Sequence, residues 1–165
     1  MTSLRDINAM KHADFVATFG DVAEHSSWVA EAAWQNHPFA SRADLIHAFA
    51  AAMHSASKEA KLALICAHPD LATRAKLTED SSQEQAGAGL DRLTREEFKR
   101  FSALNDAYRE RFGFPFIFAV KGATKGQILQ AFADRIANSP EVEFETALTQ
   151  IARIFRFRLE DRVSA

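Results

Sequence analysis

The chain has 165 residues, with 20 lysines and arginines against 22 aspartates and glutamates, so its formal net charge is -2. This length suits one domain with a buried core, and the balanced charge argues against nucleic acid or an anionic membrane as a partner. The single cysteine, Cys66, excludes an internal disulfide, no Cys/His cluster has zinc spacing, and no apolar run could span a membrane. The N-terminus lacks a signal-peptide layout, so we expect one cytoplasmic domain over residues 1–165.

Helix signals dominate the first half of the chain. Capping residues, breaks and apolar stripes predict helices over residues 14–19, residues 28–34, a stretch that opens at Ser41, and residues 58–66. Ser26 or Ser27 is expected to cap the second of these helices. The His37-Pro38-Phe39 sequence ends it, because the residue before a proline is pushed out of the helical region.

Three capping sequences predict helices in the second half, namely Ser81-x-x-Glu84, Thr94-x-x-Glu97 and Thr124-x-x-Gln127. Gly113 is placed to end the second of these helices in a left-handed conformation. Ser139 and Pro140 supply an N-cap and a first-turn proline for the last helix. The sequence therefore predicts an all-α, single-domain helical bundle.

Residues 114–120 do not fit this helical pattern. Their sequence, Phe-Pro-Phe-Ile-Phe-Ala-Val, is apolar and favours an extended conformation, and glycines stand on either side of it. No second strand is available for pairing, although buried backbone N–H and C=O groups need partners. Neighbouring loops or a partner subunit could satisfy them, or some could face a polar ligand. The residues alone leave both interpretations open.

His68 is the first candidate for chemistry. It stands where a helix must end, and its imidazole titrates near neutral pH. A histidine at a helix C-terminus is often only a favourable charge at the end of the helix dipole. In contrast, Pro69 fixes the local backbone, which suits a group that must be held at one angle.

Glu84 is the second candidate. As part of a capping box it would only reach back to the backbone amide of Ser81. However, Gly87 and Gly89 follow it, and small residues in a helix suggest close packing of another backbone or a ligand. Such packing would place Glu84 in a crowded interior.

Arg158 is the third candidate, because the apolar stripe of the last helix leads to it, whereas Arg153 and Arg156 fall off the stripe. A buried arginine needs an anion. That anion is either a ligand group suited to the planar guanidinium or an internal partner such as Glu84 or Asp70, and a snorkelling side chain is a further alternative.

Two other functions remain possible on the residues alone. In a non-enzymatic helical binding module, His68, Glu84 and Arg158 would form an internal ion network. A metal-dependent hydrolase using His68 and Asp70 is disfavoured, because no further histidine–aspartate pair completes a ligand set. The remaining histidines show no ligand spacing, and Cys66 is expected to pack as a small apolar group.

Taken together, the motifs resemble the 2-oxo-4-hydroxy-4-carboxy-5-ureidoimidazoline (OHCU) decarboxylase family of purine catabolism. The resemblance covers nearly the whole chain and is carried by Glu24-His25-Ser26-Ser27-Trp28, His37-Pro38-Phe39, Ala67-His68-Pro69-Asp70-Leu71, Leu77-Thr78, Ser81-x-x-Glu84-Gln85-x-x-x-Gly89-Leu90, Leu104-Asn105-x-x-Tyr108, Phe112-Gly113-Phe114-Pro115-Phe116-Ile117 and Arg158-Leu159. The chain departs from the family at His37, where arginine is usual, and at Ser27, where proline is favoured.

The resemblance implies an all-helical bundle, a homodimer, a small-molecule substrate, and neither a cofactor nor a metal. It implies catalytic roles for His68, Glu84 and Arg158, with His68 as acid/base. It also implies substrate contacts from Pro69, Ser81, Glu84, Gln85, Phe116, Ile117, Phe118, Ala119, Val120 and Arg158. Residues 116–120 would contribute backbone groups, which favours the ligand interpretation of the extended segment.

The implied reaction needs no cofactor. The substrate carboxylate sits on a ring carbon beside a carbon–nitrogen double bond, which accepts the electrons as carbon dioxide leaves. The resulting enol-like species is protonated at the former imine carbon, and protonation from one face gives (S)-allantoin. The enzyme would position the substrate, stabilise developing charge and deliver one proton.

Overall fold

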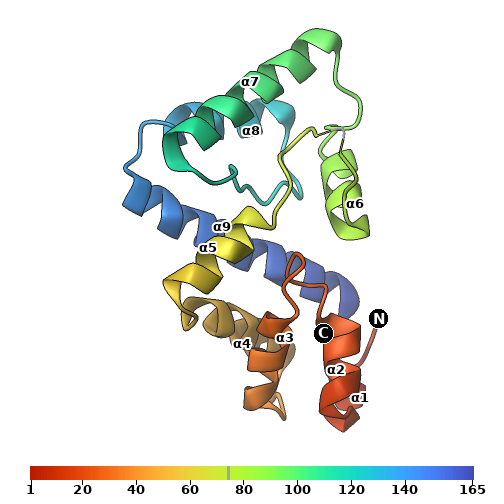
Figure 1. Ribbon diagram of the computed structural model, residues 1–165. Helices are drawn as coiled ribbons and strands as arrows, with labels where there is room; N and C mark the ends of the chain where they lie inside the picture. The colour runs from red at the N-terminus through yellow and green to blue at the C-terminus, as the bar shows by residue number, and fades with distance from the viewer. Residues whose placement is uncertain (74) are drawn as a thin grey trace. The chain divides into compact units, whose positions relative to one another are not determined.

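The computed structural model describes residues 1–73 and 75–165. Its helices, labelled in Figure 1, are α1 (Leu4–Ala9), α2 (His12–Phe19), α3 (Trp28–Ala33), the 3₁₀ helix η1 (Trp34–Asn36), α4 (Arg42–His54), α5 (Lys58–Cys66), α6 (Glu79–Gly87), α7 (Arg95–Phe112), α8 (Lys125–Arg135) and α9 (Pro140–Arg162). In these residues there is no β-strand, and one isolated bridge joins Thr2 and Val163. The predicted all-α class with an extended segment at residues 114–120 is confirmed.

Backbone contacts group the chain into two compact units. The first unit comprises Met1–Ala67 and Ala152–Ala165, and the second unit comprises His68–Ile151. Helix α9 begins in the second unit and ends in the first. A single domain over residues 1–165 stays a prediction. None of the helices in the described part of the chain is long and apolar enough to cross a membrane.

Local capping signals located most of the later helix ends correctly. Thr94 with Glu97 and Thr124 with Gln127 form reciprocal capping boxes at the starts of α7 and α8. Gly113 follows α7 with φ 77°, the left-handed conformation that glycine adopts without steric cost. The predicted boundaries are confirmed where the capping side chain and its target lie within one turn.

The predicted start of α6 is wrong. Thr78, three residues before Ser81, is the N-cap, and its hydroxyl accepts a hydrogen bond from the Ser81 backbone N–H at 3.3 Å. This start places the carboxylates of Glu79 and Asp80 in the first turn, where the helix dipole favours negative charge. Ser81 therefore lies inside the helix, and the predicted capping box between Ser81 and Glu84 does not form.

The first helices also differ from the prediction. Helix α1 was not predicted, and Ser27 precedes α3 without a side-chain capping bond. The Ser26 hydroxyl instead donates to the Glu24 carbonyl at 2.7 Å. In α5, the apolar side chain of Leu62 is 40% exposed.

Aromatic side chains form the core of the first unit. The buried Phe15 ring lies 5.2 Å from Phe19, 5.1 Å from Trp34 and 6.2 Å from Phe49 between centroids. Phe49 also meets Phe155 of α9 edge-on at 6.1 Å. These contacts join α2, η1, α4 and the end of α9, because each presents a large apolar ring to the same interior.

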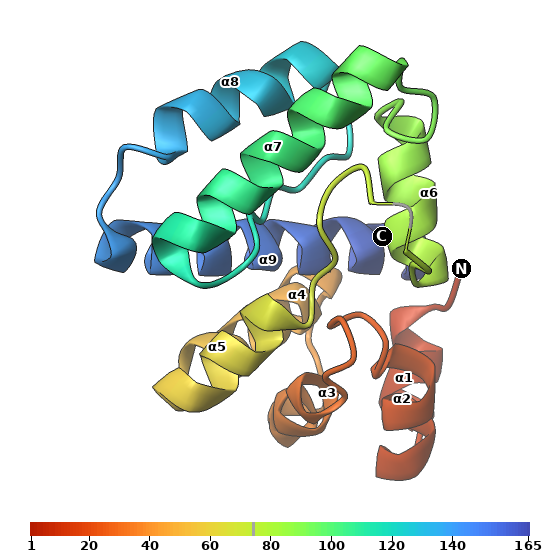
Figure 2. The same ribbon diagram turned by 45° about the horizontal axis from the view of Figure 1, so that its top comes forward.

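The core of the second unit holds the extended segment in place. The Phe116 ring stacks on Phe132 of α8 at 3.7 Å and meets Tyr108 of α7 edge-on at 5.3 Å. Phe101 of α7 also meets Phe132 at 6.3 Å, and α7 and α8 lie side by side (Figure 2). Residues 114–120 are thus buried by ring packing rather than by a sheet.

Candidate active site

His68 begins the loop that follows α5, and it is only 6% exposed. A side chain of α6 holds this loop. The Gln85 Oε1 atom accepts a hydrogen bond from the Ala72 backbone N–H at 2.9 Å, and its Nε2 donates to the Asp70 carbonyl at 3.4 Å. Gln85 was predicted to contact substrate, and the structure shows it bracing the loop that carries His68.

Helix α7 holds the same loop with two further side chains. The Asn105 Nδ2 atom donates to the Leu71 carbonyl at 2.8 Å. Arg109 pairs with the Asp70 carboxylate at 3.0 Å through both Nε and a terminal nitrogen. Both contacts end on Asp70 Oδ1, so Arg109 anchors the loop through one carboxylate oxygen.

Two residues beside the candidate groups have strained backbones. Ala72 has φ 59° and His25 has φ 47°, and they are the non-glycine residues with positive φ among those described. Such a conformation costs about 1–2 kcal/mol, so the surrounding structure must impose it. Ala72 ends the stretch that Gln85 and Asn105 hold, and His25 follows the buried Glu24. Strain of this kind is concentrated at functional sites.

Ser81, Glu84 and Gln85 lie on one face of α6, because residues three and four apart in a helix are neighbours. Ser81 is 5% and Gln85 6% exposed, and Glu84 is half-buried. Since Gln85 reaches Asp70 and Ala72, this is the face that α6 turns toward the loop bearing His68. The structure thus brings these three predicted residues together beside that loop.

No other protein segment of the described residues packs closely on Gly87, since a Cβ atom added there would meet no atom within 4 Å. Close packing of a ligand stays a prediction. Gly89, which follows the end of α6, has a φ of 80°. Glycine adopts this left-handed conformation without steric cost.

Side chains satisfy part of the backbone of the extended segment. The Ile117 carbonyl accepts a hydrogen bond from an Arg135 terminal nitrogen at 2.5 Å, and the Ala119 N–H donates to Gln150 Oε1 at 3.0 Å. These two backbone groups are hydrogen-bonded by side chains, not by the backbone of a loop or of a second strand. Contacts between residues 116–120 and a substrate stay a prediction.

Arg135 belongs to a buried polar network that sequence reasoning missed. Its Nε donates to Glu143 Oε1 at 2.8 Å, and the Tyr108 hydroxyl donates to the same oxygen at 2.5 Å. Arg135 is 8% and Glu143 0% exposed, and the guanidinium lies 4.3 Å from the Phe116 ring centroid. The network fixes the guanidinium that holds Ile117. No motif signals it, because Tyr108 and Glu143 lie 35 residues apart.

Tyr108, the single tyrosine of the chain, gives this network a spectroscopic test. Burial, and then the hydrogen bond to Glu143, raise the pKa of Tyr108 well above its ordinary value. The unfolded state therefore loses this proton first, near pH ~10, so this contribution to stability is complete below that pH and is lost as the pH rises above it.

We expect the tyrosinate absorption band to stay absent in alkali until the protein unfolds. Absorbance and helical circular dichroism should be followed together during an alkaline titration, with urea-unfolded protein as the control. Ionisation near pH ~10 with the helical signal intact would contradict the buried network.

Arg158 is buried, as the apolar stripe predicted, and it lies in the first unit. One terminal nitrogen contacts the Val22 carbonyl at 3.1 Å and Glu24 Oε2 at 3.3 Å. These partners differ from the expected Glu84 and Asp70. Glu24, 1% exposed, was missed as the partner because it lies 134 residues from Arg158.

Four other residues considered in the sequence analysis lie outside the candidate site. Arg153 and Arg156 are exposed, as predicted. His37 Nε2 donates to the Asn8 carbonyl at 2.8 Å, and its ring stacks on Trp34 at 3.9 Å, so it is structural in this protein. Cys66 was expected to pack but is exposed.

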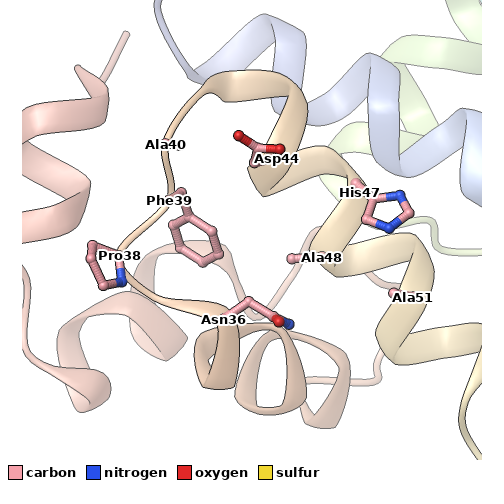
Figure 3. A pocket seen from close by; sticks show the side chains of 8 residues that line it. All are labelled: Asn36, Pro38, Phe39, Ala40, Asp44, His47, Ala48 and Ala51. Atoms are coloured by element: carbon pink, nitrogen blue, oxygen red, sulfur yellow. The ribbon is translucent and has the colours of Figure 1, made fainter.

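A surface pocket of about 400 Å³ lies beside α4 in the first unit (Figure 3). Its buried lining comes from Phe39 and Ala48, and the exposed side chains of Asp44 and His47 also line it. It includes none of the predicted site residues. Across residues 1–73 and 75–165 no group of three or more His, Cys, Asp or Glu side chains could hold a metal ion.

Comparison with known proteins decides the family. The family model for OHCU decarboxylase matches residues 8–160. The chain belongs to the OHCU decarboxylase family. It is 45% identical over 159 residues to the 2-oxo-4-hydroxy-4-carboxy-5-ureidoimidazoline decarboxylase of Halalkalicoccus jeotgali, covering 96% of this chain and 90% of that relative.

Two further relatives agree with this family. The decarboxylase of the same description from Haloferax volcanii is 43% identical over 163 residues, covering 99% of this chain and 97% of that protein. The crystal structure of an (S)-allantoin synthase superposes with a TM-score of 0.82 at 34% identity, covering 99% of this chain and 54% of that chain. The family resemblance seen in the motifs is therefore confirmed along the length of the chain.

Proposed function

We propose that this protein is a carboxy-lyase that converts OHCU to (S)-allantoin in urate degradation. The family match supports the reaction. The observation that carries the site is the buried His68 in a strained loop, braced by Gln85 from the α6 face that also bears Ser81 and Glu84. A loop held this tightly keeps a proton-transferring group at one angle.

The reaction divides into two steps. First, the bond between the ring carbon and the carboxylate breaks, and its electron pair moves into the adjacent carbon–nitrogen double bond as carbon dioxide leaves. The nitrogen that received the pair takes up a proton, and the enol-like product takes another at the former imine carbon. The ring hydroxyl loses its proton as it becomes a carbonyl, so one proton is taken up overall. No external electron acceptor is required, because the imine of the substrate accepts the pair, and so we propose that no cofactor takes part.

In our proposal His68 handles the proton, and Glu84 orients the imidazole. A histidine suits this role, because a pKa near neutral lets it both give and take a proton. Pro69, Ser81 and Gln85 line the site around the substrate. The backbone of residues 116–120 contributes further hydrogen bonds to it.

Arg158 is proposed as a cationic contact to a polar edge of the ring or the ureido group. Its planar guanidinium suits a carboxylate or a pair of carbonyl oxygens. Pairing with a buried carboxylate also fixes its orientation before substrate arrives.

The assembly is carried over from the resemblance. We propose a homodimer in the cytoplasm that acts on a small molecule and binds neither nucleic acid nor membrane. The formal net charge of -2 supports the absence of a polyanionic partner.

The proposed reaction has a direct assay. OHCU is generated from urate with uricase and hydroxyisourate hydrolase, this protein is added, and circular dichroism is followed. We expect rapid formation of one allantoin enantiomer, because protonation from a single face of the planar intermediate sets the configuration. A slow, racemic product at the rate of the protein-free control would show that the chain is not this enzyme.

A non-enzymatic binding module is the second candidate function. The observation favouring it is that Arg158 already has an internal carboxylate partner, which is Glu24 and not the Glu84 of the predicted ion network. The same assay separates the two functions, since a binding module would leave the rate and the racemic outcome unchanged.

A further inference from the structure

Asn105 has a buried acceptor that the protein leaves unused. The residue is 6% exposed and lies on the inner face of α7, one turn before Tyr108. Among the described residues, no hydrogen-bond donor reaches its Oδ1 atom. A buried amide oxygen without a donor costs about 1–3 kcal/mol, so a native protein keeps one only where something else satisfies it.

The orientation of the amide is fixed by its other end. Nδ2 donates to the Leu71 carbonyl at 2.8 Å. Turning the amide over would place Oδ1 against that carbonyl, two acceptors facing each other. Oδ1 is therefore held as an acceptor beside the loop that His68 begins.

Three side chains that contact the same loop or share helix α7 with Asn105 bind other groups. Gln85 binds Asp70 and Ala72, and Arg109 pairs with Asp70. The Tyr108 hydroxyl donates to Glu143, not to Asn105. Among the described residues nothing supplies the missing donor, which leaves an ordered water or a bound molecule to do so.

We propose that Asn105 is a substrate-binding residue whose Oδ1 accepts a hydrogen bond from an N–H of the substrate. This inference rests on the proposed function, since OHCU and allantoin both carry N–H groups on the ring and on the ureido arm. A neutral acceptor fits them, because it adds no charge to a site that must accommodate a carboxylate. Asn105 would then select ureido compounds over analogues that lack the N–H.

The first test is a crystal structure of the wild-type protein with (S)-allantoin. We expect a ligand nitrogen about 2.7–3.2 Å from Asn105 Oδ1. If Oδ1 binds only an ordered water, or the ligand nitrogens lie beyond hydrogen-bond reach, the inference is wrong. This readout does not depend on any variant folding.

The second test compares Asn105→Leu with Arg109→Gln, which loosens the same loop without touching the acceptor. For Asn105→Leu we expect KM for OHCU and the Kd for (S)-allantoin to rise about tenfold, the loss of one buried hydrogen bond. For Arg109→Gln we expect the Kd for (S)-allantoin to stay within about twofold of wild type, because an exposed ion pair contributes little.

The kinetic constants distinguish a substrate contact by Asn105 from a role in holding the loop of His68. If Asn105 only held the loop of His68, Asn105→Leu would lower kcat and leave the allantoin Kd unchanged, which would overturn the inference. Wild-type protein that fails to turn over OHCU would overturn the proposed function and this inference with it. Normal wild-type turnover with an unchanged allantoin Kd in Asn105→Leu would overturn the inference alone.

Discussion

Replacing His68 by asparagine is expected to lower kcat for OHCU about 100- to 10,000-fold, the usual contribution of a general acid or base. Asparagine is smaller than histidine but keeps one hydrogen-bonding edge, and it cannot give or take a proton at neutral pH. Because the loop is braced through its backbone and Asp70, the substitution should leave the fold intact. Steady-state kinetics and a thermal melt measure the two effects.

The matched control is His54→Asn, an exposed histidine at the end of α4. It should retain the wild-type kcat, since it lies outside the proposed site. A His68→Asn protein that melts like the wild type and keeps the full rate would remove His68 from the mechanism. In that case the proton must come from another group, and the family reaction could still stand.

Replacing Glu143 by alanine is expected to reduce the free energy of unfolding by about 3–5 kcal/mol, the cost of breaking a buried ion pair by removing one partner. Arg135 would keep its charge in an interior position where, within the described part of the chain, the Ile117 carbonyl and aromatic rings remain beside it. The Tyr108 hydroxyl would lose its acceptor as well. Urea denaturation followed by circular dichroism measures the loss.

Glu145→Ala is the control, because Glu145 is exposed two residues further along α9. Its effect should lie within about 0.5 kcal/mol, as for most surface substitutions. The two variants should also differ in an alkaline titration. The hydrogen bond to Glu143 raises the pKa of Tyr108, and this bond is lost in Glu143→Ala but kept in Glu145→Ala. A loss for Glu143→Ala no larger than that of the control would show that the network does not stabilise the fold.

Capping signals predicted helix ends correctly where the capping residue and its backbone partner lie within one helical turn. Thr94 with Glu97, Thr124 with Gln127, and Gly113 each act through backbone groups three or four residues away, so their spacing alone located the helix ends. The start of α6 was misplaced, because Thr78 and Ser81 both offer a capping hydroxyl. The sequence does not rank two such residues one turn apart.

The sequence indicated only part of the candidate site. His68 and Glu84 stood out by their residue types and neighbours, and the family resemblance supplied Gln85 and the substrate contacts of the extended segment. The two buried ion pairs, Arg158 with Glu24 and Arg135 with Glu143, were not found, since their partners are fixed by packing. Asn105 was noticed only as part of a motif.

By itself the sequence determined the helical class, the break at residues 114–120, the burial of Arg158 and the family. These properties follow from periodicity, capping and motif order, which are written along the chain. The tertiary structure decided which polar groups satisfy one another: Gln85 with the loop of His68, and Arg135 with Ile117. Burial makes each unpaired donor or acceptor costly, so these pairings are set only once distant segments are packed together.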